Sequence, residues 1–117
     1  MLKKLNRLVK KKDFDNIYKK GRSSFDKIIG VKTLKNDLDI NRFGIVVSSK
    51  VSRKAVERNK IKRRLREALR PQLEELKPGN DLVIISLPEI IKKDFNDIHT
   101  SLRRHLYKLY LYKTTKR

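Results

Sequence analysis

Residues 49–70 constrain the fold most, because they combine a high density of positive charge with nothing that would interrupt a helix. Ten of these residues are lysine or arginine, two are glutamate, and none is glycine or proline. The pattern predicts one basic helix over about 52–70, with Ser52 as its N-cap. Pro71 stands where such a helix would kink or end.

The expected helix has two different flanks when its residues are placed at about 100° per residue. One arc is apolar or neutral and should pack on a core, and the adjoining arc is cationic. Arg58 breaks this division, since it lies near the centre of the apolar arc, one turn before Ile61. It either extends past the edge of the core or is held by a carboxylate or a phosphate, because an unpaired buried guanidinium is costly. The apolar arc holds Ile61, Leu65, Ala68, Leu69, Gln72 and Leu76, and the cationic arc holds Asn59, Lys62, Arg63, Arg66 and Arg70.

Like charges follow one another along this helix at a spacing of four residues, and each such pair is mildly destabilising. The row is formed by Arg58, Lys62, Arg66 and Arg70. It is either an ordinary solvated face or a surface for an anionic partner. The whole chain favours the second reading, because 32 basic residues against 13 acidic ones give a formal net charge of +19 and a pI near 10.4. Such a balance is typical of nucleic-acid-binding domains. Attachment to a membrane surface is disfavoured, since the apolar arc lacks aromatic anchors.

Length and composition predict a single domain over residues 1–117, large enough to fold without disulfides or metals. No run approaches the roughly 18 apolar residues that span a bilayer. The N-terminus also lacks a signal-peptide pattern, so we expect a cytoplasmic protein without membrane attachment. The absence of cysteine excludes disulfides and thiolate metal sites. His99 and His105 do not share a helix face, so each is interpreted as an ordinary polar helix position.

The chain before the basic helix is expected to hold one short helix and two or three strands. A basic segment, 1–11, precedes a helix over about 12–20 that begins near Asp13 and is stopped by Gly21 as a left-handed cap.

Two strands are predicted next, at 25–35 and at about 42–49, and they are interpreted as an antiparallel pair. Gly30 marks a bulge or a close approach in the first. Alternation in the second puts Phe43, Ile45 and Val47 on one face and Gly44, Val46 and Ser48 on the other.

The chain after the basic helix is expected to hold a strand and a final helix. Residues 81–87 form a short continuous apolar run between a Pro-Gly-Asn turn and Pro88, which suits a central strand buried on both faces. A helix over about 94–112 follows, with Tyr107, Tyr110 and Tyr112 packing at its edge. The order predicts an α+β sandwich, with helices against one side of a small sheet.

No catalytic constellation stands out in the sequence. The acidic residues are scattered and have capping or solubility explanations, and there is no glycine-rich phosphate loop or nucleophile elbow. The polypeptide is therefore interpreted as a binding protein. Phe14 and Tyr18 of the first helix are either core residues or, beside neighbouring lysines, a platform on which unpaired bases stack.

The stretch KAVERNKIKRRLRE, residues 54–67, resembles the signature helix of the bacterial ribonuclease P protein family. The similarity extends to residues 6–21, with two aromatics and a following glycine, to the strand RFGIVVSSK and to the stretch PGNDLVIIS, so it covers nearly the whole chain. The resemblance implies an αβββαβα two-layer sandwich with a left-handed βαβ crossover, similar to ribosomal protein S5 domain 2. It also implies a protein subunit that assists a catalytic RNA.

In this family the complex removes the 5′ leader of precursor tRNA by Mg²⁺-dependent endonucleolytic cleavage, and the RNA holds the active site and most of the metal. The resemblance therefore implies partnership with the catalytic RNA and precursor tRNA. It implies no organic cofactor and no catalytic or metal-binding residue in the protein. The protein is expected to be inactive alone and monomeric outside the complex. By position in the motif, the contacts to catalytic RNA would be Arg53, Lys54, Arg58, Asn59, Lys60, Lys62, Arg63 and Arg66, and the contacts to the leader would be Phe14, Tyr18 and Lys32. Lys60 and Lys32 depart from the family pattern, which commonly has arginine and an aromatic residue there.

Overall fold

The computed structural model describes residues 7–113, so the predicted basic segment 1–11 falls largely outside the described part. The order of its elements confirms the expected αβββαβα arrangement and the α+β class. The elements are α1 (Lys11–Lys20), β1 (Arg22–Phe25), β2 (Ile29–Lys35), β3 (Arg42–Val46), α2 (Ala55–Leu69), the 3₁₀ helix η2 (Arg70–Glu75), β4 (Asn80–Ser86), the 3₁₀ helix η3 (Pro88–Lys92) and α3 (Phe95–Lys108).

The four strands form one mixed sheet in the order β1-β2-β4-β3. The apolar strand β4 lies in the middle, as predicted, antiparallel to β2 and parallel to β3. The expected antiparallel pairing of the strands at 25–35 and 42–49 is wrong, because β4 is inserted between them. A strand whose side chains are apolar on both faces gains most from a central position, where layers can cover both faces.

The predicted strand at 25–35 corresponds to β2, but its first residues belong to a hairpin turn and to the end of β1, whose last residue is Phe25. Asp26 makes the turn, since its Oδ1 atom accepts hydrogen bonds from the backbone N–H groups of Ile28 and Ile29, at 2.8 and 2.9 Å. The close approach expected at Gly30 is confirmed: the ring of Phe25, its cross-strand partner, occupies the space that a Cβ atom would need.

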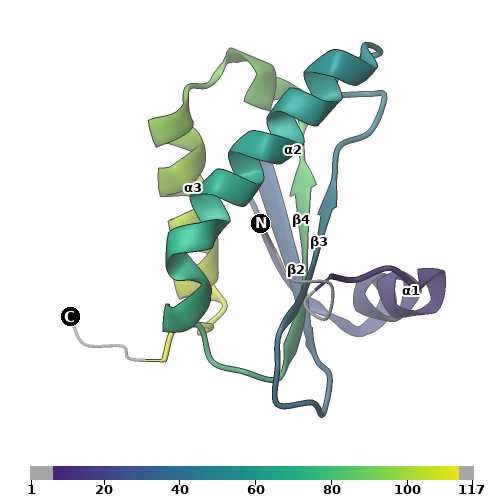
Figure 1. Ribbon diagram of the computed structural model, residues 1–117, viewed down its shortest axis with the longest axis vertical. Coiled ribbons are helices and arrows are strands. Elements are labelled where there is room, and N and C mark those ends of the chain that lie inside the picture. The colour runs from purple at the N-terminus through teal and green to yellow at the C-terminus, as the bar shows by residue number, and fades with distance from the viewer. Residues whose placement is uncertain (1–6, 114–117) are drawn as a thin grey trace.

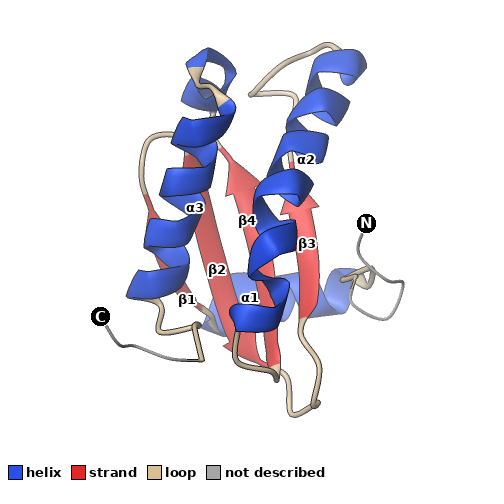
Figure 2. Cartoon of the chain, turned by 60° about the vertical axis from the view of Figure 1, so that its left-hand side comes forward, coloured by secondary structure: helices blue, strands red, loops and turns tan. Residues whose placement is uncertain are grey.

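The connection from β3 through α2 to β4 joins two parallel neighbours. In Figure 2, α2 lies in front of the sheet and β4 lies to the left of β3, with both strands pointing upward, so the crossover is left-handed. The hand is the reverse of the general rule for βαβ units, and it agrees with the expectation from the resemblance.

Helices cover both faces of the sheet, not one as the order of elements predicted. α2 and α3 pack side by side on one face, where they form the main core (Figure 1). α1 lies on the opposite face, where the fully buried Ile17 packs with Leu8 and Val83 in a smaller core. Phe43 joins the main core and Val46 borders the smaller one, which confirms the predicted alternation. None of the helices in residues 7–113 is long and apolar enough to cross a membrane.

The basic helix begins slightly later than expected and ends where expected. Ser52 is not the N-cap: α2 begins at Ala55, and the Ser52 hydroxyl instead accepts a hydrogen bond from the backbone N–H of Lys54, at 3.1 Å. The end near Pro71 is confirmed, because the chain tightens there into η2. α3 begins as predicted, with a capping box between Asp94 and Asp97.

Gly21 ends α1 but not as a left-handed cap, since its φ of −74° and ψ of 154° are extended. A Cβ atom at this position would lie 2.5 Å from the carbonyl oxygen of Ile17 and 2.8 Å from that of Thr33. Glycine is therefore needed because backbone from α1 and β2 converges on it.

Candidate nucleic-acid interface

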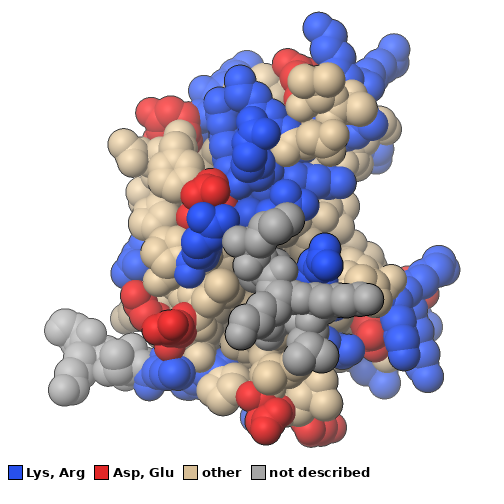
Figure 3. Space-filling model, viewed as in Figure 1, with Lys and Arg blue, Asp and Glu red and all other residues tan. Residues whose placement is uncertain are grey.

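The basic helix α2 is held on the sheet by its apolar arc, as its periodicity predicts. Ile61, Leu65, Ala68 and Leu69 are buried. The flank that faces outward carries Asn59, Arg63 and Arg66, which are exposed, and Lys62, which is half-buried. In Figure 3 lysine and arginine side chains gather along the course of α2 on this face of the molecule.

Arg58 lies at the edge of the core, which agrees with the first of the two alternatives left by the sequence. It is half-buried, and its Nη1 atom donates a hydrogen bond of 2.9 Å to the backbone carbonyl oxygen of Ser52 in the segment before α2. No carboxylate is needed to hold it. The bond anchors the guanidinium at the start of the cationic row.

Three of the four residues in the cationic row have no acidic partner on α2, and the fourth, Arg70, has one. Glu57 accepts a hydrogen bond from the Ser52 hydroxyl, and Glu67 pairs with Arg70, where Arg70 Nη2 lies 3.4 Å from Glu67 Oε2. Within residues 7–113 no ion pair involves Arg58, Lys62 or Arg66. A continuous group of cations is thus available to an external anion.

The structure does not bring all the predicted RNA contacts onto one flank. Arg53 and Lys54 are exposed just before α2, at the same end as Arg58. Lys60 instead borders a small hollow with Arg64 and Ile91 on the other side of the helix. Lys60 is therefore separated from the cationic row by the width of α2.

The second group of predicted residues lies on the opposite face of the sheet. Lys32 of β2 projects beside α1, with its Nζ atom 5.9 Å from the centre of the Tyr18 ring and 3.5 Å from the Tyr18 carbonyl oxygen. Tyr18 is 41% exposed, and burial of the remainder, together with the charge of Asp15, raises the pKa of its hydroxyl. The pair forms an aromatic and cationic surface of the kind that holds single-stranded nucleic acid.

Phe14 lies against the sheet on this same face. Its ring covers Gly44, at which a Cβ atom would lie only 2.7 Å from two ring carbons. The ring is half-buried among the residues of the smaller core, so Phe14 serves both packing and the exposed surface. The structure thus confirms the packing role of Phe14, and base stacking on it stays a prediction.

An ion-pair network fixes α1 against the sheet. Arg42 Nη2 lies 2.7 Å from Asp81 Oδ2, and Arg42 Nη1 lies 3.4 Å from Asp13 Oδ2. The hydrogen bond to Asp81 is the largest cause of a raised pKa for Arg42, so the guanidinium stays charged. Because the first turn of α1 is tied to the ends of β3 and β4, the aromatics that follow are placed on the sheet.

Phe25 is an exposed aromatic on this face that sequence reasoning missed. Its side chain is 48% exposed, and the ring lies over Gly30, two residues along β2 from Lys32. The sequence signal for this contact was the spacing of five residues between Phe25 and Gly30. Without knowledge of the β1-β2 hairpin, nothing indicated that these two residues are cross-strand partners. The face of the sheet that α1 covers, called the outer face below, therefore carries three aromatic rings, those of Phe14, Tyr18 and Phe25.

His105 is not the ordinary helix position that the sequence indicated. It is 1% exposed, its Nδ1 atom lies 2.7 Å from the Ser24 hydroxyl, and its Nε2 atom lies 3.1 Å from Asp26 Oδ2 without hydrogen-bond geometry. Although serine, histidine and aspartate come together here, the imidazole is closed off from solvent, so a substrate cannot reach it. The cluster instead ties the β1-β2 hairpin to α3.

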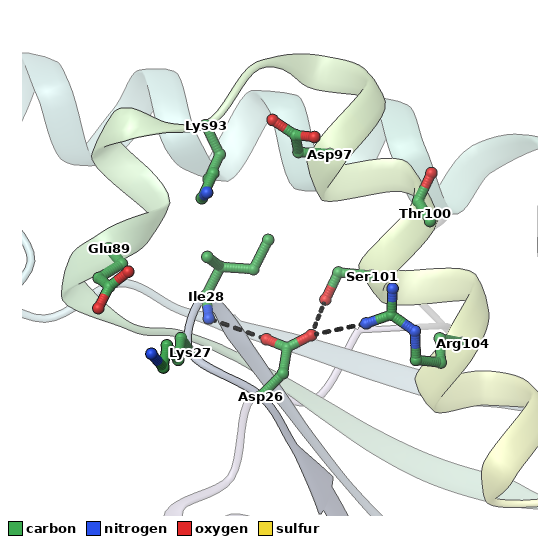
Figure 4. A pocket seen from close by; sticks show the side chains of 9 residues that line it. All are labelled: Asp26, Lys27, Ile28, Glu89, Lys93, Asp97, Thr100, Ser101 and Arg104. Atoms are coloured by element: carbon green, nitrogen blue, oxygen red, sulfur yellow. Dashed lines mark hydrogen bonds and ion pairs between the residues drawn. The ribbon is translucent and has the colours of Figure 1, made fainter.

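Asp26 is the centre of that tie. Figure 4 shows its carboxylate between Ser101 and Arg104 of α3 and the backbone N–H of Ile28, at the floor of a pocket of about 360 Å³. Burial alone would raise the pKa of Asp26, but the hydrogen bonds from Ser101 and from the backbone, with the nearby His105, lower it. The part of the chain that the structure describes holds no cluster of three acidic or histidine side chains suited to a metal ion.

The fold and these two surfaces define a small basic α+β protein with a left-handed crossover, a cationic helix on one face of the sheet and exposed aromatics on the other. The family model for ribonuclease P matches residues 2–110. The chain belongs to this family, and it is therefore a protein component of the tRNA 5′-processing ribonuclease.

Individual relatives agree with this placement. The ribonuclease P protein component of Clostridium botulinum (strain 657 / Type Ba4) is 39% identical over 110 residues, which cover 93% of this chain and 98% of that protein. That of Caldanaerobacter subterraneus is 33% identical, with both chains fully covered. Among solved structures, the Staphylococcus aureus protein superposes with a TM-score of 0.84 at 33% identity, over 92% of this chain and 98% of that one. The Thermotoga maritima protein gives a TM-score of 0.75 at 32% identity, over 94% and 98%.

Proposed function

We propose that the chain binds the catalytic RNA of ribonuclease P through α2 and the 5′ leader of precursor tRNA through the face that carries Phe14, Tyr18 and Lys32. It thereby assists Mg²⁺-dependent removal of the leader. The strongest support is the placement of two different surfaces on opposite sides of one sheet, an unneutralised row of cations on α2 and a cation beside exposed aromatics near α1. Two RNA strands can then be held at once without competing.

The role of α2 follows from charge. Each phosphate that a lysine or arginine neutralises releases counterions, which favours binding and lowers the repulsion between two polyanions brought together. The contacts proposed are Arg53, Lys54, Arg58, Asn59, Lys60, Lys62, Arg63 and Arg66. Arg58 is held in advance by Ser52, so less of its side-chain freedom is lost on binding.

The outer face adds binding energy that only the precursor can use. Bases of a single-stranded leader stack on Tyr18 and Phe14 while Lys32 meets a phosphate. Mature tRNA has no leader, so the substrate is bound more tightly than the product.

The reacting groups and the Mg²⁺ ions are assigned to the RNA. The described residues offer no acidic cluster for a metal, and the one buried histidine is closed off. We assign the protein to the cytoplasm, as a monomer outside the complex.

Reconstitution tests the proposal. At physiological Mg²⁺ concentration, added protein should restore cleavage of precursor tRNA by the catalytic RNA, whereas protein freed of RNA should not cut the precursor. A general RNA-binding protein would bind both RNAs without restoring cleavage, and a protein nuclease would cut without the catalytic RNA. Either result would overturn the assignment.

A further inference from the structure

A groove on the outer side of α3 belongs to neither of the two surfaces described above. It has a volume of about 800 Å³ and is walled by Arg103 and Tyr107 of α3, by Tyr112 and Lys113 of the segment that follows, and by Glu75 at the end of η2. Its volume is in the range of small-molecule sites, about 300–1,000 Å³. Because α3 and η2 supply its walls, the groove lies on the face of the sheet that α2 and α3 cover, opposite to α1; Figure 1 shows the placement of these helices.

One wall of the groove is rigid. The helix ends at Lys108 because Tyr110 takes a left-handed backbone conformation, with φ of 59°, and the chain then returns along η2. The backbone N–H of Lys113 donates to the Glu75 carbonyl oxygen at 2.8 Å, and the Tyr112 hydroxyl donates to Gln72 Oε1. The Tyr112 ring is therefore fixed before any ligand arrives.

The opposite wall carries an aromatic ring that packing does not explain. Tyr107 was expected to pack at the helix edge, but it is 64% exposed. Its ring is therefore open to a ligand, and unlike the equally exposed Tyr110 it lines the groove. One turn earlier on the same helix face, the Arg103 guanidinium lies 5.6 Å from the centre of the Tyr112 ring.

The charge of the groove is positive. Arg103 and Lys113 form no ion pair within residues 7–113, and Glu75 is the single acid in the lining. Arg104, also in the lining, is partly occupied by Asp26, at 3.4 Å. Two free cations beside two tyrosine rings suit a ligand that is both anionic and flat.

We propose that this groove binds an unpaired nucleotide of RNA, whose base stacks on Tyr107 while Arg103 and Lys113 hold its phosphates. Aromatic faces and cations together are the means by which proteins hold single-stranded nucleic acid. The inference rests on the proposed function in one respect. The nucleotide is taken to belong to the RNA that binds α2, since the groove and α2 lie on the same face of the sheet. It adds a third contact surface to the two already described.

Photo-crosslinking tests the groove directly. The full chain is irradiated with a short single-stranded oligoribonucleotide that contains 5-bromouridine, and the crosslinked peptides are identified by mass spectrometry. A crosslink at Tyr107 is expected. Arg103→Gln should reduce its yield and weaken oligonucleotide binding about fivefold or more, whereas Lys108→Gln, which removes a charge from α3 outside the groove, should do neither.

A second pair of variants separates stacking from folding. Tyr107→Ala should weaken oligonucleotide binding, and Tyr110→Asn should not, because Tyr110 is 68% exposed but lies outside the groove and asparagine tolerates its backbone conformation. Equal affinities for the two variants, or crosslinks only at Phe14 and Tyr18, would overturn the inference. Self-association in sedimentation that Tyr107→Ala abolishes would also overturn it, by assigning the groove to a second copy of the chain. Binding of catalytic RNA that depends on α2 but gives no Tyr107 crosslink would leave the proposed function intact and reject only the groove.

Discussion

His105 of α3 is buried with its Nε2 atom 3.1 Å from the Oδ2 atom of Asp26 in the β1-β2 hairpin. Burial is the main reason that the pKa of His105 is lowered, and the charges of Arg104 and Lys108 act in the same direction while Asp26 opposes them. The imidazole is thus held neutral, in the place where the hairpin is tied to the last helix.

We expect stability to fall when the pH drops below about 6.5. The unfolded chain has an ordinary histidine pKa near that value, about 6.5, so between it and the lower folded pKa the unfolded state binds more protons. The free energy of unfolding, measured with urea at about pH 7.5 and about pH 5.5, should therefore be smaller at the lower pH. The lowered pKa of Asp26 affects stability in a separate pH range. The stabilisation that the ionised Asp26 gives to the fold is lost only as the pH falls below its ordinary pKa of 3.8.

His105→Gln should reduce this pH dependence, whatever it does to the absolute stability. The matched control is His99→Gln, which removes the other histidine of α3 and should leave the dependence in place. If both variants lose stability with pH as the wild type does, the assignment to His105 is wrong.

Gly21→Ala is expected to destabilise the fold by about 1–3 kcal/mol, as overpacking does. Replacing a glycine with alanine at an ordinary φ usually stabilises through the unfolded state, and here φ is ordinary, at −74°. The added Cβ atom would instead press on the carbonyl oxygens of Ile17 and Thr33, both backbone atoms that cannot move aside. Urea unfolding measures the change.

Gly30→Ala is the comparison for that experiment. The three atoms nearest to its Cβ atom would all belong to the ring of Phe25, a half-exposed side chain that can turn away, so the loss of stability should be smaller. A Gly21→Ala protein as stable as the wild type would show that the backbone there can open.

The features predicted correctly from sequence are those that local periodicity encodes. The apolar arc of α2 follows from spacing along one helix, and the position of β4 follows from a run with no polar face. Arg58 shows what local periodicity does not encode. Its spacing placed it on the apolar arc, but its hydrogen-bond partner is the Ser52 carbonyl oxygen, which lies outside the helix.

The errors concern relationships across the chain. The pairing of β4 between β2 and β3 depends on which strands meet in space, and no local pattern carries that information. His105 looked like a surface residue because its partner Ser24 is 81 positions away in sequence. Gly21 was interpreted as a left-handed helix cap, which is the commonest role of a glycine after a helix. The structure shows instead that the carbonyl oxygen of Thr33 in β2 leaves no room for a Cβ atom there.

Arg58→Ala or Lys62→Ala should weaken binding of the catalytic RNA and reduce its salt dependence by about one ion per lost contact. The affinity is measured at several salt concentrations, and the slope of its logarithm is compared with that of the wild type. Lys35→Ala is the control, since Lys35 is exposed at the end of β2, outside the proposed surface. An unchanged slope in the α2 variants would mean that these residues do not contact phosphate.

The double variant Phe14→Ala/Tyr18→Ala should weaken binding of precursor tRNA by about tenfold or more and change binding of mature tRNA much less, because stacked bases contribute about 1–3 kcal/mol each and only the precursor has a leader. The measurement is the affinity of the reconstituted complex for both RNAs. Tyr18→Ala alone should act in the same direction without the packing loss at Phe14, which covers Gly44. Phe95→Ala is the matched control, since Phe95 is 42% exposed, as Tyr18 is 41%, but lies on α3. Equal losses for precursor and mature tRNA would assign the pair to folding, because a structural defect does not distinguish an RNA with a leader from one without.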